Sequence, residues 1–213
     1  MPSIEVLPVF VVASLALLVV PGPAVFYIVA RSGAQGQRAG IVSVLGVHTG
    51  SLLHVMAAVA GLSAVVMTSS VAFTAIKVVG GAYLVYLGVK TLLGASSVDV
   101  AVPTLDKPLR RLFLDGLVVN LLNPKVALFF LAFLPQFVSR TDGPVWSQTL
   151  VFGLLYIALG LVSDGTYAFI GARAGGWLRR RAVVRRRGKY VEGGVLIGLG
   201  ITALAAPHHQ PAQ

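Results

Sequence analysis

The segments Val20-Pro21-Gly22-Pro23 and Asn123-Pro124-Lys125 decide how this chain folds. Each interrupts an apolar run of membrane length, and the two breaks lie 101 residues apart, at matching places in the two halves of the chain. Inside a bilayer a broken helix leaves backbone N–H and C=O groups without partners, so breaks are tolerated only where protein or a polar cavity covers them. Paired breaks in related halves are typical of transporters that bind substrate between two repeats.

The composition indicates an integral membrane protein. Hydrophobic residues make up 56% of the chain and charged residues 11%, whereas about 25% of the residues in a soluble domain are charged. The mean hydropathy is +0.87. Because a spanning helix needs about 20 apolar residues, we predict an all-α integral membrane protein with six transmembrane helices, at Leu7–Ala30, Ile41–Met67, Val71–Leu93, Leu112–Val138, Gln148–Gly171 and Val191–Ala206.

The basic residues predict the orientation. Of 17 Lys and Arg residues, 14 lie in or beside the first, third and fifth connections between these helices, and only Arg140 lies in another connection. The positive-inside rule makes the three basic connections cytoplasmic, so both termini are expected outside. Met1–Glu5 lacks the basic region of a cleavable signal peptide, and we expect the first helix to be retained.

The net charge of +10 does not indicate a nucleic-acid-binding protein. The densest basic segment, Arg179–Lys189, has no aromatic residues among its arginines and adjoins a membrane helix, so anionic lipid headgroups are its expected partners. The chain has no cysteine, which excludes disulfides and thiolate metal sites. We predict no cofactor and no metal.

The two halves of the chain share one order of sequence features, which indicates an internal repeat. In each half a proline break comes first, a long helix with an early glycine follows (Gly46 and Gly153), and a Gly-Gly helix comes last. Three spans per half is an odd number, so two halves of one fold must have opposite orientations in the membrane. We predict inverted three-helix repeats at residues 1–95 and 109–207, a cytoplasmic linker at 96–108 and a polar tail at 208–213.

Ionisable residues inside the predicted helices are candidates for function, because each costs about 2.5–3.5 kcal/mol to insert. Lys125 and Asp164 fall at nearly the same depth, and we expect them to pair. Protonation of Asp164 would then release the lysine, as a proton-coupled cycle requires; a static ion pair is the structural alternative. His54 lies on the small-residue face of its helix, where it either relays protons or hydrogen-bonds a carbonyl. His48 is about 240° around the same helix, and we do not expect the two histidines to share a site.

The breaks offer a second kind of binding group. A half-helix that begins at Pro23 or Pro124 presents unpaired N–H groups and the positive end of its dipole, which suit a carboxylate. Asn123 adds an amide. Helix ends, an aspartate and a lysine together suit a small zwitterion, and the residues alone indicate a small polar solute that carries a carboxylate.

Several of these motifs resemble the LysE/RhtB family of amino-acid exporters. The resemblance lies in Pro21-Gly22-Pro23, in Gly46-xxx-Gly50-xxx-His54, in Gly80-Gly81-Ala82-Tyr83-Leu84 and in Asn120-Leu121-x-Asn123-Pro124-Lys125, and it covers almost the whole chain. It implies a bacterial inner-membrane exporter of amino acids or close derivatives, such as threonine, homoserine or its lactone, or leucine, driven by proton antiport. The positions that match the family are Pro21, Gly22, Pro23, Gly46, Gly50, Asn123, Pro124 and Lys125; Asp164 and His54 are our candidates for proton coupling.

Two departures from the family's patterns narrow the range of expected substrates. Some basic-amino-acid exporters of the family carry an acidic residue after the second glycine of the second helix, and here that residue is Ser51, which disfavours lysine and arginine. The cadmium-resistance branch is disfavoured because soft metals select thiolates. A channel or a membrane scaffold is the alternative. An enzyme is not expected, since the chain has no nucleophile elbow and no P-loop. A homodimer is compatible with the sequence.

Overall fold

A computed structural model describes residues 6–68 and 106–178, with scattered positions between 75 and 93 and between 190 and 204. The described chain is helical. Its α-helices are α1 (Leu7–Val19), α2 (Pro23–Gln35), α3 (Gln37–Thr68), α5 (Leu109–Leu121), α6 (Pro124–Leu128) and α7 (Val145–Leu178). Between α6 and α7 lie a π-helical turn at Phe129–Phe133 and 3₁₀ turns at Leu134–Phe137 and Arg140–Asp142.

Both predicted breaks are confirmed. The axis bends by 53° between Leu7–Val19 and Pro23–Gln35, and by 50° between Leu109–Leu121 and Pro124–Phe137. Proline has no N–H and cannot continue a helical ladder, so each helix ends just before the break and a new one begins at Pro23 or Pro124. Two described helices, α3 and α7, are long and apolar enough to cross a membrane alone, and the count rises to four if each bent pair forms one span.

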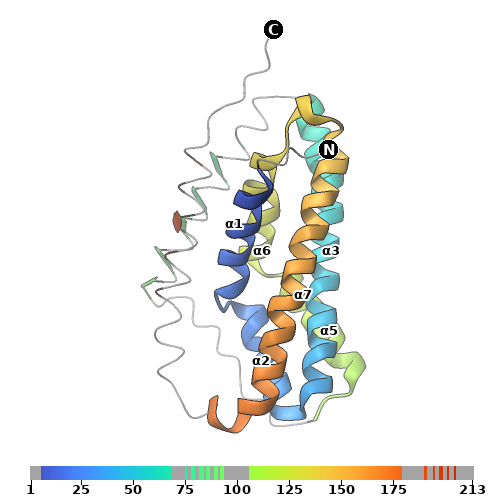
Figure 1. The fold of residues 1–213 in the computed structure, drawn as a ribbon, viewed down its shortest axis with the longest axis vertical. Helices are drawn as coiled ribbons and strands as arrows, with labels where there is room; N and C mark the ends of the chain where they lie inside the picture. Colours follow the sequence, from blue (N-terminus) through green and yellow to red (C-terminus); the bar gives the residue numbers. More distant parts are fainter. Residues whose placement is uncertain are drawn as a thin grey trace.

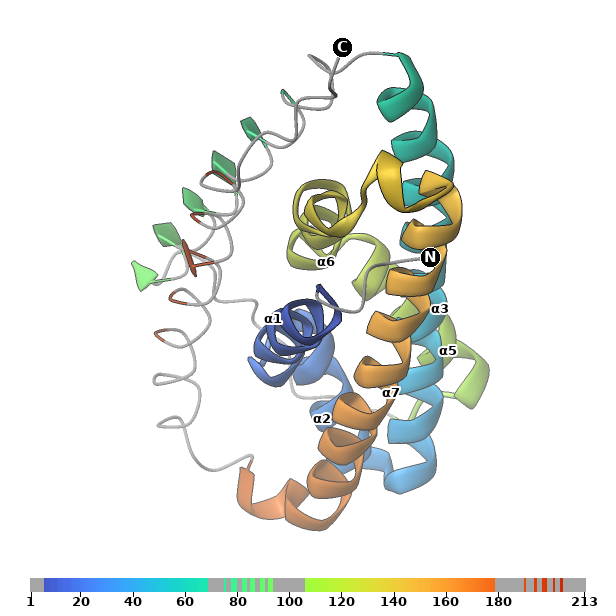
Figure 2. The ribbon, with the colours of Figure 1, turned by 45° about the horizontal axis from the view of Figure 1, so that its top comes forward.

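The two bent pairs run in opposite directions. In Figure 1, α1 and α2 descend from the top of the view while α5 and α6 ascend from the bottom. The long helices do the same, since α3 ascends and α7 descends. Figure 2 shows α3 and α7 side by side. Helix α3 packs against both α5 and α7, and α7 also packs against α1 and α2.

Glycines bring α3 close to its neighbours. A Cβ on Gly46 would clash with the carbonyl oxygen of Phe113 in α5, and one on Gly50 would lie 3.0 Å from the carbonyl oxygen of Leu117. A Cβ on Gly153 of α7 would likewise lie 2.6 Å from the side chain of Val55 in α3. Membrane helices associate through such small-residue faces because water does not drive their packing. Gly46 and Gly50 therefore form a contact face between α3 and α5.

The two ends of the bundle differ in character. At the end where α1 and α7 begin, aromatic rings fill the core, with Phe10 and Phe152 at a centroid distance of 4.6 Å. At the other end polar groups join α2 to α5 and to the residues just before it: the Tyr27 hydroxyl donates to the Leu112 carbonyl at 2.7 Å, and the Gln35 amide donates to the Lys107 carbonyl at 2.9 Å. Arg38, Arg110, Arg111 and Arg173 belong to helix segments at this second end, as expected for one membrane face.

Four predicted spans agree with described elements, and each helical segment extends beyond its apolar run at one end or at both. The predicted third and sixth spans, Val71–Leu93 and Val191–Ala206, lie mostly outside the described residues, as do the 96–108 linker up to residue 105, the 208–213 tail and Arg179–Lys189. The inverted repeat and its boundaries therefore stay predictions.

Candidate functional site

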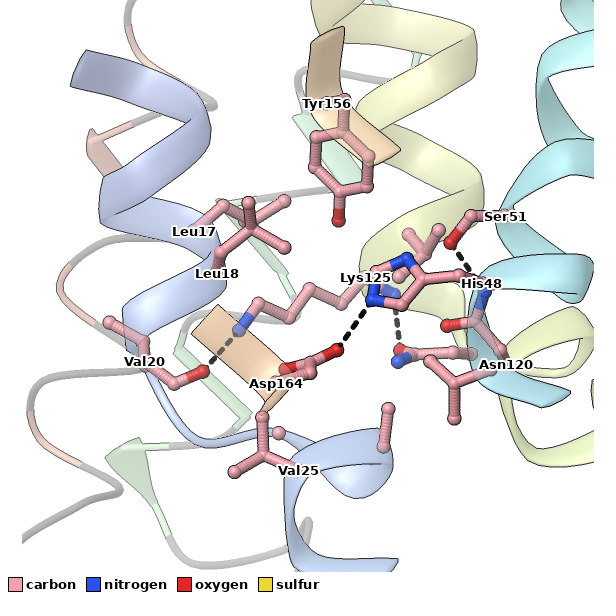
Figure 3. A pocket seen from close by; sticks show the side chains of 15 residues that line it. Leu17, Leu18, Val20, Val25, His48, Ser51, Asn120, Lys125, Tyr156 and Asp164 are labelled. Atoms are coloured by element: carbon pink, nitrogen blue, oxygen red, sulfur yellow. Dashed lines mark hydrogen bonds and ion pairs between the residues drawn. The ribbon is translucent and has the colours of Figure 1, made fainter. Parts of the chain in front are cut away.

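A small cavity lies where the two breaks meet α3 and α7 (Figure 3). Its volume is about 30 Å³, room for one or two water-sized molecules, whereas a site that holds a small organic ligand has about 300–1,000 Å³. The lining comes from both broken segments and both long helices: Leu17, Leu18, Val20, Gly22, Ala24, Val25, Val47, His48, Ser51, Asn120, Asn123, Lys125, Val126, Tyr156 and Asp164.

A buried acid and a buried imidazole meet in this cavity. The Nε2 atom of His48 in α3 lies 3.0 Å from the Oδ2 atom of Asp164 in α7. Only 5% of the His48 side chain and 5% of the Asp164 side chain are exposed. The other carboxylate oxygen, Oδ1, and the other ring nitrogen, Nδ1, have no hydrogen-bond partner. Because an unpaired buried polar atom costs about 1–3 kcal/mol, these two atoms mark the place where a ligand or a proton would be stabilised.

Lys125 links the two breaks. Its Nζ atom donates to the carbonyl oxygen of Val20, at the end of α1, at 2.8 Å. The neighbouring carbonyl of Val19 accepts from the Tyr167 hydroxyl of α7 at 2.6 Å. A helix that ends inside the protein leaves its last carbonyls without intrahelical donors, and two side chains from the second half of the sequence supply donors here. The break after α1 is thus covered by protein, as a break inside a membrane must be.

The predicted pairing of Asp164 with Lys125 stays a prediction, and each of the two residues has another hydrogen-bond partner. Both residues line the cavity, as their matching depths predicted. The hydrogen-bond partner of Asp164, however, is His48, while the Lys125 ammonium reaches the carbonyl of Val20. The lysine donates to Val20 because a carbonyl at a helix end has no intrahelical donor.

His54 lies apart from this pair. Its Nε2 atom lies 3.2 Å from the carbonyl oxygen of Asn120, and its ring stacks on Phe130 with a centroid distance of 6.1 Å. It does not line the cavity described above. Of the two interpretations offered for His54, a hydrogen bond to a carbonyl is the one seen. The expectation that the two histidines occupy different sites is confirmed, but the histidine beside the acid is His48.

The other predicted site residues fall into two groups. Gly22, Asn123 and Lys125 line the cavity. Pro21, Pro23 and Pro124 form the breaks without lining it, and Gly50 packs against Asn120 of α5. Their roles in binding stay predictions.

Three further polar residues were not singled out as site residues from the sequence. The Asn120 amide donates to the Ser51 hydroxyl at 3.0 Å, which ties α5 to α3 at the cavity wall. Tyr156, 2% exposed, contributes its phenol from α7 (Figure 3). His48 crosses α7 at a glycine, since a Cβ on Gly160 would clash with the imidazole ring, a contact that the sequence does not reveal.

Comparison with known proteins identifies the family to which this chain is similar. Residues 15–206 match the family described as LysE type translocator. A homoserine/homoserine lactone efflux protein of Salmonella typhimurium is 29% identical over 170 residues, which cover 80% of this chain and 82% of the relative. A leucine efflux protein of Salmonella choleraesuis is 30% identical over 133 residues, 62% of this chain and 63% of the relative. An uncharacterised membrane protein of Vibrio cholerae is 26% identical over 204 residues, 96% of this chain and 98% of the relative. No solved structure matches the chain.

Proposed function

Because the chain belongs to the LysE type translocator family, we propose that it exports neutral amino acids or close derivatives, such as homoserine, its lactone, threonine or leucine, in exchange for protons. The names of two relatives, which refer to homoserine and its lactone and to leucine, support this substrate class. The apolar lining residues Leu17, Leu18, Val47 and Val126 also favour an uncharged substrate side chain.

One observation carries the proposal: Asp164 has one carboxylate oxygen bound to His48 and one without a partner, in a cavity between the two broken segments. A carboxylate in this position binds either the ammonium group of an amino acid or a proton, but not both. When two ligands compete for one site, release of one permits binding of the other, and that competition is the basis of exchange.

The cycle then has two legs. On the outward leg the substrate's ammonium group donates to Oδ1 of the charged Asp164, and the amino acid leaves outside. On the return leg a proton from outside forms an O–H bond at Oδ1, and that proton is released to the cytoplasm. His48 holds Oδ2 on both legs and fixes the direction in which Oδ1 points. The proton gradient drives export because the return leg requires a proton.

The proposal also places the protein in the membrane. Paired broken helices that run in opposite directions support inverted repeats and alternating access around the cavity. The clustering of basic residues at one end supports a bacterial inner-membrane protein with that end in the cytoplasm and both termini outside. Fusion of a reporter active only in the periplasm to each terminus tests this orientation.

Efflux from cells tests the function. Cells loaded with dipeptides are followed for export of radiolabelled threonine, homoserine and leucine, with and without an uncoupler, for the wild type, Asp164→Asn and the control Asp106→Asn, an exposed acid. We expect Asp164→Asn to lose at least about 90% of uncoupler-sensitive efflux, since a tenfold change needs only about 1.4 kcal/mol, and Asp106→Asn to retain it.

Other outcomes decide between the alternatives. Efflux whose rate is unchanged by the uncoupler and depends only on the solute gradient identifies a channel. A wild type that exports none of the solutes contradicts the amino-acid assignment and favours a scaffold. Gradient-driven efflux that persists in Asp164→Asn keeps the substrate class and removes Asp164 from the coupling mechanism.

A further inference from the structure

The end of α1 and the starts of α2 and α6 border the cavity, and protein groups pair with the ends of α1 and α6. The last carbonyls of α1 accept from Lys125 and Tyr167. The first amide of α6 that needs an acceptor, the N–H of Lys125, donates to the Oδ1 atom of its own cap Asn123 at 3.1 Å. The N-terminus of α2 has no such cap, because its cap residue is Gly22.

The uncapped end of α2 presents two donors. Pro23, its first residue, has no N–H, so the donors are the backbone amides of Ala24 and Val25, which have no acceptor in the described part of the chain. Both residues line the cavity and are at most 8% exposed. In a 13-residue helix these amides form the positive end of a dipole, equivalent to about half an elementary charge. An anionic group is the ligand that suits them.

A second observation points to the other half of the same ligand. The unpartnered Oδ1 atom of Asp164, on a residue 4% exposed, belongs to the same cavity and suits a cationic donor. In Figure 3 the Asp164 carboxylate lies between the His48 ring and the first turn of α2 at Val25. A buried pair of donors beside a buried acceptor matches a molecule that carries a carboxylate and an ammonium on one carbon atom.

We propose that the uncapped first turn of α2 binds the α-carboxylate of the substrate through the N–H groups of Ala24 and Val25, while Asp164 binds its α-ammonium. This assignment rests on the proposed function and adds to it which of the two breaks recognises the carboxylate. The α2 end offers two uncapped donors, whereas at the α6 end the Asn123 side chain already accepts from the N–H of Lys125.

Gly22 is the position at which this assignment is tested. Its backbone angles, φ −110° and ψ −169°, are extended, and any residue adopts them. An aspartate at a cap position accepts hydrogen bonds from the second and third residues of its helix, which here are Ala24 and Val25. Gly22→Asp therefore fills the two donors with an internal carboxylate. Gly22→Ala adds bulk without an acceptor and is the matched control, and Gly22→Ser is a smaller cap.

The experiment measures how strongly the protein prefers a free carboxylate. Inhibition constants are determined in inside-out membrane vesicles, by competition with a radiolabelled substrate, for the pairs homoserine and homoserine lactone, and leucine and leucinamide. The second member of each pair lacks the carboxylate. We expect the wild type and Gly22→Ala to prefer the acid by about 10-fold or more, since hydrogen bonds to a charged group are worth about 1.5–3 kcal/mol. Gly22→Asp should abolish that preference, and Gly22→Ser should reduce it.

Three results would overturn the assignment. In the first, the wild type has no preference for the acid. In the second, Gly22→Asp and Gly22→Ser both keep the preference. In the third, Gly22→Asp weakens the binding of the acid and of its carboxylate-free partner equally, which means that the end of α2 stabilises Asp164 instead of the substrate. All three require a wild type that transports amino acids. A wild type that transports none contradicts the proposed function itself, so the two failures are distinguishable.

Discussion

At the scale of single residues, two histidines on one helix have different surroundings. His48 is 5% exposed and lies 3.0 Å from Asp164, whereas His54 contacts a backbone carbonyl and a phenylalanine ring. The sequence predicted correctly that they occupy different faces of α3. It named His54, and not His48, as a candidate for proton coupling, because periodicity shows which residues share a face of α3 but not which face meets α7.

Truncation of each histidine tests their roles. We expect His48→Ala to lower gradient-driven efflux about tenfold, because it leaves both oxygens of Asp164 without a donor, and a buried hydrogen bond to a charged group is worth about 1.5–3 kcal/mol. His54→Ala should lower efflux less than about threefold. Efflux per unit of membrane-inserted protein is the measurement. A larger loss of efflux in His54→Ala than in His48→Ala would indicate that His54 is the histidine involved in proton coupling.

At the scale of elements, the breaks were predictable and the helix lengths were not. Proline chemistry alone located both bends. The fifth span was predicted at Gln148–Gly171, and the corresponding helix α7 is observed at Val145–Leu178. Hydropathy marks only the apolar part of a helix, while its hydrogen-bonded ladder continues into polar residues at either end. The π-helical turn at Phe129–Phe133 was not predicted, because a shift in the hydrogen-bond ladder leaves no hydrophobic period in the sequence.

Close helix contacts make Gly46 sensitive to substitution. Gly46→Ala places a methyl group against the Phe113 carbonyl, a backbone atom that cannot turn away, and we expect a destabilisation of about 1–3 kcal/mol. Gly165→Ala in α7 is the control, since its Cβ would meet nothing within 4 Å. Thermal unfolding of both variants in detergent is the measurement. Equal stability of the two variants would contradict the packing of α3 on α5.

The cap on α6 is a second local contribution. Asn123→Ala removes the side-chain acceptor of the Lys125 amide, and we expect the protein to lose about 1 kcal/mol of stability. Asn123→Ser retains an acceptor and should lose less than half of that. Thermal unfolding with each variant in the same detergent distinguishes them, and an unchanged midpoint in Asn123→Ala would show that α6 does not depend on its cap.

At the scale of the whole molecule, the cavity is too small for the proposed substrate. About 30 Å³ is far below the volume of a ligand site, so the described conformation must open to bind an amino acid. The contacts between α2 and α5, at Tyr27 and Gln35, close the end that carries the basic residues. The sequence predicted a site between two repeats but not its size, because volume depends on how side chains from distant segments interlock.

A reversible cross-link tests whether that end must open. The chain has no cysteine, so Gln35→Cys with Lys107→Cys creates a unique pair at a place where a side chain of α2 already reaches the backbone before α5. We expect a short bifunctional thiol reagent to stop efflux in the double variant, and a cleavable version to restore it after reduction. Each single variant treated with the reagent is the control. Full efflux from the cross-linked protein would contradict opening at this end.

The single unpartnered oxygen of Asp164 has an electrical consequence. An amino acid that leaves as a zwitterion carries no net charge, whereas the proton that replaces it on the carboxylate carries one. On the proposed exchange, each turn of the cycle moves one positive charge into the cell, and a membrane potential of 100 mV contributes about 2.3 kcal/mol to it. Voltage alone would then drive export when the pH is equal on both sides, so the protein would act as a generator of inward current.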